Sequence, residues 1–354
     1  GTANTMGALC ESLGMMLPGS SLIPSSTSMR RFSARESGST VMKLVEQQIR
    51  PSQIITKEAL ENTVTLLSAI GGSLNAMIHL PALAAELGLE LDWDDIAKIT
   101  SKTPVLCGIV PNGNLTAVDL HYAGGIPAVM KELRDKLHGE CLNVCGLSLG
   151  EILEQTKDGD RTVIHTAGEP LEKANGIQVL YGNLAPQGAL VKTSAVPENV
   201  RVFEGTAKVF DGEDACYAAF RDHAIHEGDA VIVRYEGPKG GPGMKELHRI
   251  TEIIKGIPRT AVITDGRFSG ASGGLSIGYL CPEAEEGGPI ALVKNGDRIQ
   301  VDLYKGMIHL DVSDEELISR RNAWEHGEKK KEKGLLGRYA AMVGNARQGA
   351  TFHI

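Results

Sequence analysis

The hydrophobic pattern of this chain changes once, near the polar cluster Lys157-Asp158-Gly159-Asp160. Before this cluster, apolar residues recur mostly at helical spacing, whereas after it short apolar runs are separated by turn residues. Many short strands at close spacing predict a closed or strongly curved sheet with a few helices outside it. A chain of 354 residues is also long enough for two domains. We therefore expect two domains, residues 1–160 and residues 161–354.

Helices are predicted where apolar residues recur every three or four positions between capping and stop signals. Thr56 is placed to N-cap one of them, and Asp92 opens another. The run Pro104–Val110 is continuously apolar and is typical of a buried strand. Besides the short helix that Asp92 opens, the helices expected in the first half are at 5–13, 30–48, 56–71, 73–87, 128–137 and 147–155.

The second half predicts mainly strands, because short apolar runs lie between turn residues. The expected strands are 178–181, 189–192, 201–203, 207–210, 230–235, 260–264, 290–293, 298–302 and 307–310. The expected helices are 212–223, 313–323 and 334–343.

Charge and composition exclude several classes of function. Lys and Arg number 36 against 44 Asp and Glu, so the net charge is −8 and gives no attraction for a polyanion. Aromatic residues make up only 4%, which argues against a surface for base stacking. No apolar run approaches the ~18 residues that cross a bilayer, and the first residues do not resemble an export signal. We expect a cytoplasmic protein that binds neither nucleic acid nor membrane.

Six cysteines are too sparse for a disulfide framework, and we expect them to stay reduced. Cys141 and Cys145 lie close together and raise the alternative of a metal site. No second Cys or His pair with ligand spacing follows them. We interpret both as small core thiols.

Glycine is more frequent than in an average protein, at 42 of 354 residues, and it clusters beside apolar runs. One Gly-rich segment, 236–246, follows the strand expected at 230–235, and another, 265–274, follows the strand expected at 260–264. Such loops present backbone N–H groups to a ligand, or they are elaborate turns. Neither has the spacing of a P-loop or of a dinucleotide fingerprint, and Ser269 does not lie in a nucleophile elbow. Asp265 and Ser269 therefore either act on a ligand or cap the turn.

Several phrases together resemble the dihydroxy-acid dehydratase and sugar-acid dehydratase family. The resemblance spans nearly the whole chain, and its motifs stand in family order. They are Gly1-Thr2-Ala3-Asn4-Thr5-Met6, Leu17-Pro18-Gly19, Gly71-Gly72-Ser73-Leu74-Asn75-Ala76, Gly182-Asn183-Leu184-Ala185-Pro186, Arg234 to Met244, Thr264 to Ser272, and Cys281-Pro282-Glu283-Ala284.

The resemblance implies an α/β fold, with a helix-rich α/β N-terminal part followed by a swivelling β-barrel-like domain with flanking helices. Residues 1–160 would be the C-terminal part of a truncated α/β cofactor domain, and residues 161–354 would carry the catalytic Gly-rich loops. The implied reaction removes water from a 2,3-dihydroxy carboxylic acid and gives a 2-keto-3-deoxy acid. Its implied cofactors are Mg²⁺ and an iron–sulfur cluster, in a homodimer or homotetramer.

The resemblance also assigns roles to residues. Ser269 corresponds to the base that takes the C2 proton, and a neighbouring cation must lower its pKa. Glu246 corresponds to a magnesium ligand and offers the hard oxygen donor that Mg²⁺ prefers. The expected substrate-binding residues are Asn75, Gly243, Arg267 and Ser272.

The chain departs from the family pattern in ways that bear on substrate and cofactors. Leu74 replaces a Thr that is usual in the family, and Ser272 stands where many members have Thr. The family's cluster cysteines and its other magnesium ligands belong to segments before Gly1. We therefore expect part of a longer enzyme, inactive by itself, with no cluster ligand among its six cysteines. His79 and His248 are left out of the catalytic set.

Two substrates and one further class of function stay open. The phrase Tyr235-Glu236-Gly237-Pro238-Lys239 favours the branched-chain biosynthetic dehydratases, which we place first. The details at Glu246-Leu247-His248 and Gly270-Ala271-Ser272-Gly273 favour aldonate or 6-phosphogluconate dehydratases. The alternative to an enzyme is a non-catalytic folding or interaction module.

Overall fold

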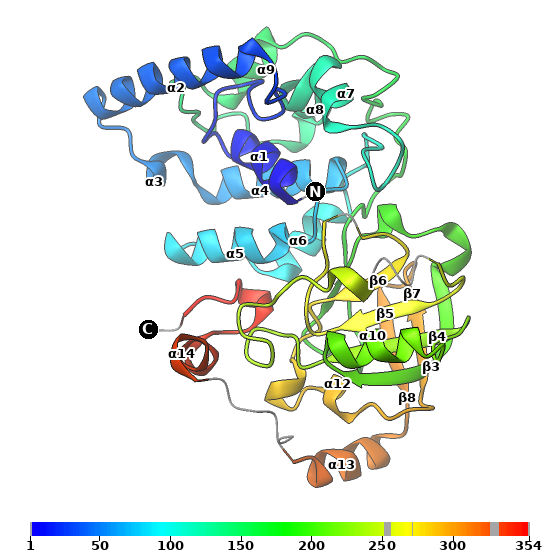
Figure 1. Cartoon of the computed structure of the whole chain (residues 1–354). Helices are drawn as coiled ribbons and strands as arrows, with labels where there is room; N and C mark the ends of the chain where they lie inside the picture. The colour runs from blue at the N-terminus through cyan, green and yellow to red at the C-terminus, as the bar shows by residue number, and fades with distance from the viewer. Residues whose placement is uncertain (1, 251–255, 271, 326–332, 353–354) are drawn as a thin grey trace. The chain divides into compact units, whose positions relative to one another are not determined.

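The computed structural model describes residues 2–250, 256–270, 272–325 and 333–352. The chain forms two compact units (Figure 1). The first comprises Gly1–Ala76 and Leu83–Gly176, and the second comprises Met77–Ala82 and Ile177–Ile354. A domain division at residue 160 stays a prediction.

The first unit is helical, as the first half of the sequence predicts. Helix α4 is its centre, because side chains along its whole length are buried. Thr56 caps this helix by accepting the Ala59 N–H at 3.2 Å. Asp92 caps α6 by accepting the N–H groups of Asp94 and Asp95 at 2.9 and 3.0 Å. The helices are α1 (Thr2–Ser12), α2 (Ser28–Glu46), α3 (Pro51–Ile54), α4 (Lys57–Ala69), α5 (Ala76–Glu86), α6 (Trp93–Thr100), α7 (Ala117–Tyr122), α8 (Gly125–Glu132) and α9 (Leu149–Gln155).

Two expectations for the first unit are wrong. The run 104–110 is not a strand: it is largely buried, but it makes only single bridges, Val105 with Glu172 and Ile109 with Leu115. A strand needs a neighbouring strand along its length, and this run has none among the described residues. Cys145 is exposed and Cys141 only half-buried, so neither is the core thiol expected.

The second unit is a mixed sheet of eight described strands in the order β1-β2-β6-β5-β4-β3-β7-β8. The neighbours β3, β4, β5 and β6 run parallel, and the other pairs are antiparallel. The strands are β1 (Gln178–Leu180), β2 (Ala189–Val191), β3 (Val202–Asp211), β4 (Asp229–Arg234), β5 (Ala261–Thr264), β6 (Leu275–Gly278), β7 (Arg298–Asp302) and β8 (Met307–Asp311).

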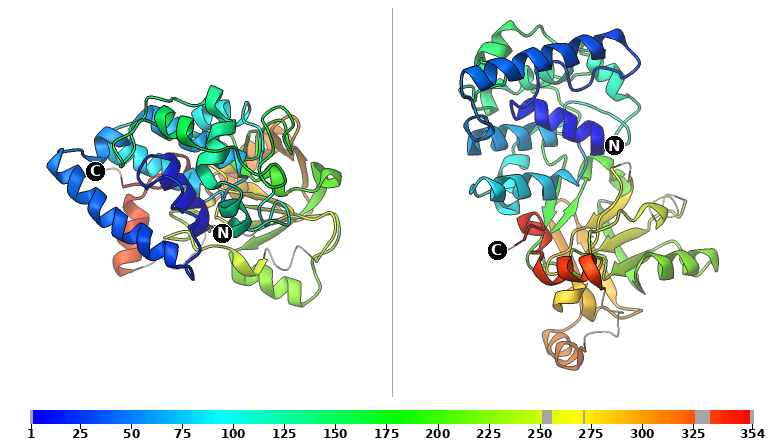
Figure 2. Two further views of the ribbon diagram at one scale, coloured as in Figure 1. Left: turned by 90° about the horizontal axis from the view of Figure 1, so that it is seen from above. Right: turned by 60° about the vertical axis from the view of Figure 1, so that its left-hand side comes forward.

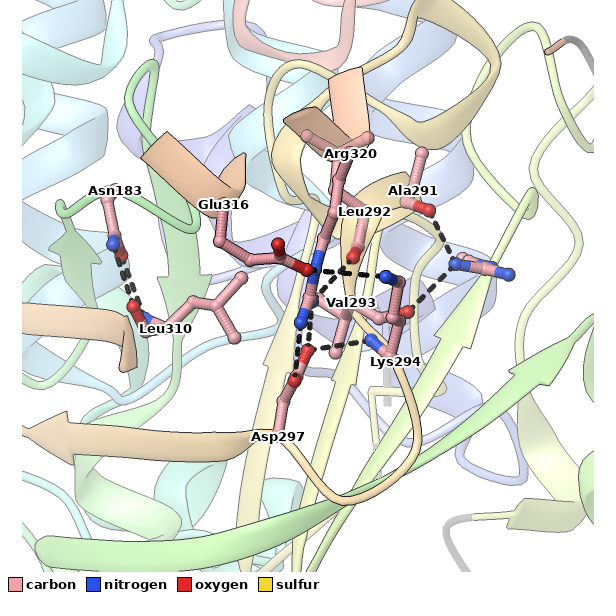
Figure 3. Close-up of polar contacts among 10 residues, drawn as sticks. Asn183, Ala291, Leu292, Val293, Lys294, Asp297, Leu310, Glu316 and Arg320 are labelled. Carbon is pink, nitrogen blue, oxygen red and sulfur yellow. Dashed lines mark hydrogen bonds and ion pairs between the residues drawn. The ribbon is translucent and has the colours of Figure 1, made fainter. Parts of the chain in front are cut away.

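The two edge strands of this sheet meet beside Tyr181, so that the sheet nearly closes into a barrel. Figure 2 shows the strands and the flanking helices of this unit from two further directions. Tyr181 donates its N–H to the Gly306 carbonyl, and its own carbonyl accepts the Ile308 N–H, both at 2.9 Å. The Asn183 side chain continues this seam by bonding the N–H and the carbonyl of Leu310, each at 2.8 Å (Figure 3). The expected α/β fold, a helical part followed by a barrel-like sheet with helices, is confirmed.

Alternate residues of the strands face two different cores. Ala230 and Ile232 of β4 belong to the core inside the barrel, whereas Val231 and Val233 belong to a smaller core outside it. Phe268 and Cys216 complete the outer core. The helices that flank the sheet are α10 (Glu213–Arg221), α12 (Pro289–Leu292), α13 (Asp314–Ala323) and α14 (Gly334–Met342).

Helix α13 has no fully buried residue, and it is held by Leu317, which packs against the barrel core, and by ion pairs to the turn before β7. Arg320 bonds both oxygens of Asp297, at 2.5 and 3.0 Å, and donates to the Leu292 carbonyl at 3.0 Å (Figure 3). The Asp297 carboxylate raises the pKa of Arg320 above its usual range. This contact explains how a polar helix holds its place.

Three strand expectations need correction. Segments 201–203 and 207–210 are one strand, β3, and the short strand β6, which directly follows Gly273 and Gly274, was not predicted. Segment 290–293 is largely the helical turn α12, which begins with Pro289 at its first position. All four residues of α12 are buried, and an apolar run that is buried on every side does not distinguish helix from strand.

Within the described residues, the structure contains no helix with the length and apolarity needed to cross a membrane.

Candidate active site

Two Gly-rich loops of the second unit lie side by side. The Gly-Pro loop, residues 235–246, follows β4, and the serine loop, residues 265–274, follows β5. Because β4 and β5 are parallel neighbours, both loops leave the same edge of the sheet. Glu246 and Arg267 form a parallel bridge between them, the Leu247 N–H bonds the Arg267 carbonyl at 2.8 Å, and Arg267 also donates to the Met244 carbonyl. The sequence motifs of both loops therefore meet in one place.

Asp265 fixes the start of both loops. Its side chain is fully buried and accepts the N–H groups of Tyr235 at 3.1 Å, Glu236 at 3.0 Å and Ala284 at 2.8 Å. A carboxylate that accepts three backbone amides is a strong anchor, since charge-assisted hydrogen bonds exceed neutral ones in strength. Of the two interpretations offered for Asp265, the structural one accounts for these contacts.

Glu283 holds the middle of the Gly-Pro loop. Its carboxylate accepts the N–H groups of Lys239 at 2.9 Å and of Gly240 at 2.8 Å. The side chain is only 2% exposed, and burial raises its pKa to about 7. Glu283 was not singled out in the sequence, although it lies in the Cys281-Pro282-Glu283-Ala284 phrase.

Glycine serves two purposes in these loops. A Cβ on Gly240 would lie 2.9 Å from the Tyr235 Cα, and one on Gly266 would lie 2.7 Å from the Glu236 Cβ, so both glycines are needed for packing within the protein. Gly243 differs, because its φ is +88° and nothing lies within 4 Å of the place its Cβ would take. Only the second kind of glycine leaves backbone open to a ligand.

The serine loop crosses the outer face of the sheet. Phe268 packs into the outer core, and the next residue, Ser269, is half-buried. The Ser269 carbonyl accepts the Ser272 N–H at 3.0 Å, so a local hydrogen bond holds Ser269 within this loop. The Ser272 hydroxyl oxygen is buried and has no hydrogen-bond partner among the described residues. A buried hydroxyl without a partner is unusual and favours a ligand there.

Charged side chains surround the point where the loops meet. Burial raises the pKa of Tyr279, with a smaller raising effect from Glu246 and a lowering effect from Arg267, so both charges lie near this fully buried phenol. Burial also lowers the pKa of His79, and Arg267 lowers it further. The loops thus bring the Glu246 carboxylate and the Arg267 guanidinium together near Tyr279, and the imidazole of His79, on α5, lies near the same guanidinium.

Comparisons with known proteins agree with this arrangement. The family model described as dihydroxy-acid/6-phosphogluconate dehydratase C-terminal matches residues 162–350, and its N-terminal counterpart matches residues 1–152. The chain belongs to the dihydroxy-acid/6-phosphogluconate dehydratase family.

Relatives in this dehydratase family align with almost the entire chain. The dihydroxy-acid dehydratases of Acetivibrio thermocellus and Ruminiclostridium cellulolyticum are each 46% identical over 354 residues, which is 99% of this chain and 64% of the relative. The dihydroxy-acid dehydratase of Francisella tularensis subsp. novicida is 42% identical over 355 residues, 98% of this chain and 63% of its own length. The chain therefore spans less than two thirds of the length of these curated relatives.

Most residues singled out by the resemblance to this family lie in the two loops. Glu246 and Gly243 stand in the Gly-Pro loop or at its end, and Arg267, Ser269 and Ser272 stand in the serine loop. Asn75 is the exception, because it belongs to the first unit, where it precedes α5 and is fully buried. The roles of all six residues stay predictions.

The side chains present do not by themselves fit the cofactors that the dehydratase family implies. Glu246 supplies one carboxylate, but the described residues contain no group of three or more His, Cys, Asp or Glu side chains that would hold one ion. Burial raises the pKa of Cys107, Cys216 and Cys281 to about 12, which keeps these thiols protonated and poor as ligands.

Proposed function

We propose that the whole protein is a hydro-lyase that converts a 2,3-dihydroxy carboxylic acid into a 2-keto-3-deoxy acid, as a dihydroxy-acid dehydratase of branched-chain amino acid biosynthesis. The observation that carries this is the 42–46% identity to proteins with that name along 98–99% of the chain. The meeting of the two Gly-rich loops supports it. We further propose a cytoplasmic homodimer or homotetramer.

Ser269 is the proposed base for the C2 proton. Its loop is held by the Asp265 anchor at one end and by the Gly274 N–H, which bonds the Ala195 carbonyl at 3.2 Å, at the other. A base must be within hydrogen-bond reach of the proton it removes, and a loop fixed at both ends can keep it there. The serine oxygen, as its alkoxide, takes the C2 proton, the electrons of the C2–H bond form the C2=C3 double bond, and the C3–O bond breaks to release hydroxide. The proton held by the serine balances this hydroxide, so that one water leaves in all, and the enol that remains tautomerises to the 2-keto acid.

The proposed cofactors are Mg²⁺ and an iron–sulfur cluster. Glu246 is the proposed magnesium ligand within this chain, and the other ligands of both cofactors would come from outside these 354 residues. Bound Mg²⁺ would supply positive charge beside the substrate and beside the serine oxygen, which lowers the pKa of an alcohol.

A sugar-acid substrate is the second candidate. The matching family models are named for 6-phosphogluconate as well as for dihydroxy acids. Leu74, which stands where a Thr is usual, is 9% exposed, so this change of polarity lies at a nearly buried position.

The two substrates are separated by assaying the whole protein, reconstituted anaerobically, on 2,3-dihydroxyisovalerate and on a panel of aldonates including 6-phosphogluconate. We expect 2,3-dihydroxyisovalerate to have the highest kcat/KM. A higher kcat/KM for an aldonate would replace the first candidate with the second. Failure of every dihydroxy acid would favour the non-catalytic module.

Ser269→Ala tests the proposed base. If Ser269 removes the proton, kcat should fall by at least about 10²-fold while thermal stability barely changes. The variant should also fail to exchange the substrate C2 hydrogen with solvent deuterium.

Ser313→Ala is the matched control, because Ser313 caps α13 by accepting the Glu316 N–H at 3.3 Å. Loss of a cap should cost about 1 kcal/mol of stability and leave the rate nearly intact. If Ser269→Ala behaves like this control and retains exchange, another group takes the proton.

A further inference from the structure

Lys192 is a buried cation that neither the resemblance nor the proposed mechanism uses. It follows β2 directly, in extended backbone with φ −90° and ψ 91°. The alternate residues Ala189 and Val191 face the core inside the barrel, so Lys192 points to the outer face, which the serine loop covers. Its ammonium donates to the carbonyl of Gly270, the residue after Ser269, at 3.3 Å.

The surroundings of Lys192 do not compensate its charge. The residue is 8% exposed, and no carboxylate of the described residues forms an ion pair with it. Burial is the one cause of its altered pKa, which falls to about 8, so the amine stays mainly protonated at neutral pH. Burying an ammonium without a counter-charge is energetically unfavourable, and such groups usually have an anionic partner.

A polar group without a partner among the described residues lies in the same loop. It is the buried Ser272 hydroxyl, two residues from the carbonyl that Lys192 bonds. The segment after Lys192 runs along the end of this loop, where the Gly274 N–H bonds the Ala195 carbonyl at 3.2 Å. An ammonium and a hydroxyl are the donors that a carboxylate accepts from.

We propose that Lys192 binds the carboxylate of the dihydroxy acid beneath the serine loop, with the Ser272 hydroxyl as a second donor. This assignment rests on the hydro-lyase activity proposed above, and it adds the group that recognises the acid. It places the substrate carboxylate beside Gly270, and therefore its C2 carbon near Ser269. The substrate carboxylate would also be the counter-charge that the Lys192 ammonium lacks among the described residues.

The test compares an acid with its uncharged amide in the whole protein. The ligands are 2-hydroxyisovalerate and 2-hydroxyisovaleramide, which lack the 3-hydroxyl and cannot be dehydrated, and their binding is measured by titration calorimetry. Lys192→Gln keeps an N–H donor for the Gly270 carbonyl but removes the charge. We expect the preference for the acid over the amide to fall at least about tenfold in this variant.

Lys294→Gln is the control, because Lys294 is an exposed lysine that pairs with Glu316 at 3.3 Å, on the turn before β7. It should keep the wild-type preference. An unchanged preference in Lys192→Gln, or equal loss of acid and amide binding, overturns the assignment, since a purely structural lysine affects both ligands alike.

If Lys192→Gln does not fold, the binding of the acid and of the amide to the wild-type protein still tests the proposal. Equal affinity of the wild type for acid and amide overturns the carboxylate site. Binding of neither ligand rejects the branched-chain substrate and overturns the carboxylate assignment with it, whereas equal binding of both ligands overturns the assignment alone.

Discussion

The carboxylates around the two loops have different roles, because the groups that their oxygens contact differ. Asp265 and Glu283 are buried and accept backbone N–H groups, so they hold the loops in shape. Glu246 is only partly buried, at the end of the Gly-Pro loop beside Arg267. Glu246 thus differs from the other two in reaching solvent, whereas the oxygens of Asp265 and Glu283 accept backbone N–H groups inside the protein.

Glu246→Gln should weaken the magnesium dependence of turnover. The change keeps the size of the side chain but removes the charge, so the Mg²⁺ concentration for half-maximal activity of the whole enzyme should rise at least about tenfold. The control is Glu227→Gln, an exposed carboxylate in the turn before β4. An unchanged magnesium dependence in Glu246→Gln would reject the metal-ligand role.

Glu283 should make stability depend on pH. Its pKa is raised from 4.5 to about 7 by burial, so the folded state holds the proton more tightly than the unfolded state. This contribution to stability is complete below about pH 4.5 and is lost as the pH rises to about 7. At 1.36 kcal/mol per pKa unit, about 2 to 3 kcal/mol should be lost between pH 5 and pH 8.

Glu283→Gln should remove most of that loss, because an amide oxygen can still accept the Lys239 and Gly240 N–H groups without ionising. Urea unfolding of the variant and the wild type at pH 5 and pH 8 measures it. Identical pH dependence of the two proteins would contradict the role given to Glu283.

At the scale of elements, the barrel closes where β1 and β8 meet. The seam is short, because two backbone bonds at Tyr181 and the two bonds of Asn183 join it. An edge strand without partners exposes its N–H and C=O groups. The Asn183 side chain hydrogen-bonds the N–H and the carbonyl of Leu310, and so takes the place of a residue on a neighbouring strand.

Asn183→Ala should lower the free energy of unfolding by about 1 to 3 kcal/mol, since it leaves the N–H and carbonyl of Leu310 without these partners. Asn322→Ala, at an exposed site on α13, is the control and should change stability by about 0.5 kcal/mol or less. Chemical denaturation measures both. A loss in Asn183→Ala no larger than in the control would show that the seam does not depend on this side chain.

At the scale of the whole molecule, the chain is 64% as long as the relatives from Acetivibrio and Ruminiclostridium, and its cysteines are scattered over both units. Cysteine thiolates are the usual ligands of iron–sulfur clusters, and several must converge on one cluster. Three of the six cysteines are buried, each with a pKa raised to about 12.

The 354-residue chain alone should therefore assemble no iron–sulfur cluster. Anaerobic reconstitution with iron and sulfide, followed by visible absorption, checks this, with the whole protein as the positive control. A stoichiometric cluster that is lost on mutation of Cys10, Cys141 or Cys145 would contradict the expectation.

Local signals were enough for many elements. Ser313, Thr56 and Asp92 start helices where the sequence predicts, because a cap depends on a side chain and the backbone a few residues away. Strand β7 matches its predicted bounds, since its apolar run lies between turn residues. The two Gly-rich loops, with Ser269 and Glu246 in them, were likewise visible as motifs.

Tertiary structure decided what depends on partners distant in sequence. The apolar runs at 104–110 and 290–293 did not become strands, because a strand requires a neighbour for its hydrogen bonds and burial alone does not supply one. Asp265 became an anchor because Tyr235 and Ala284 reach it from other segments. In the sequence, Lys192 is only a lysine that follows an apolar run. The structure shows that it is buried and donates to the Gly270 carbonyl of the serine loop, and this burial without a counter-charge makes it a candidate for binding an acid.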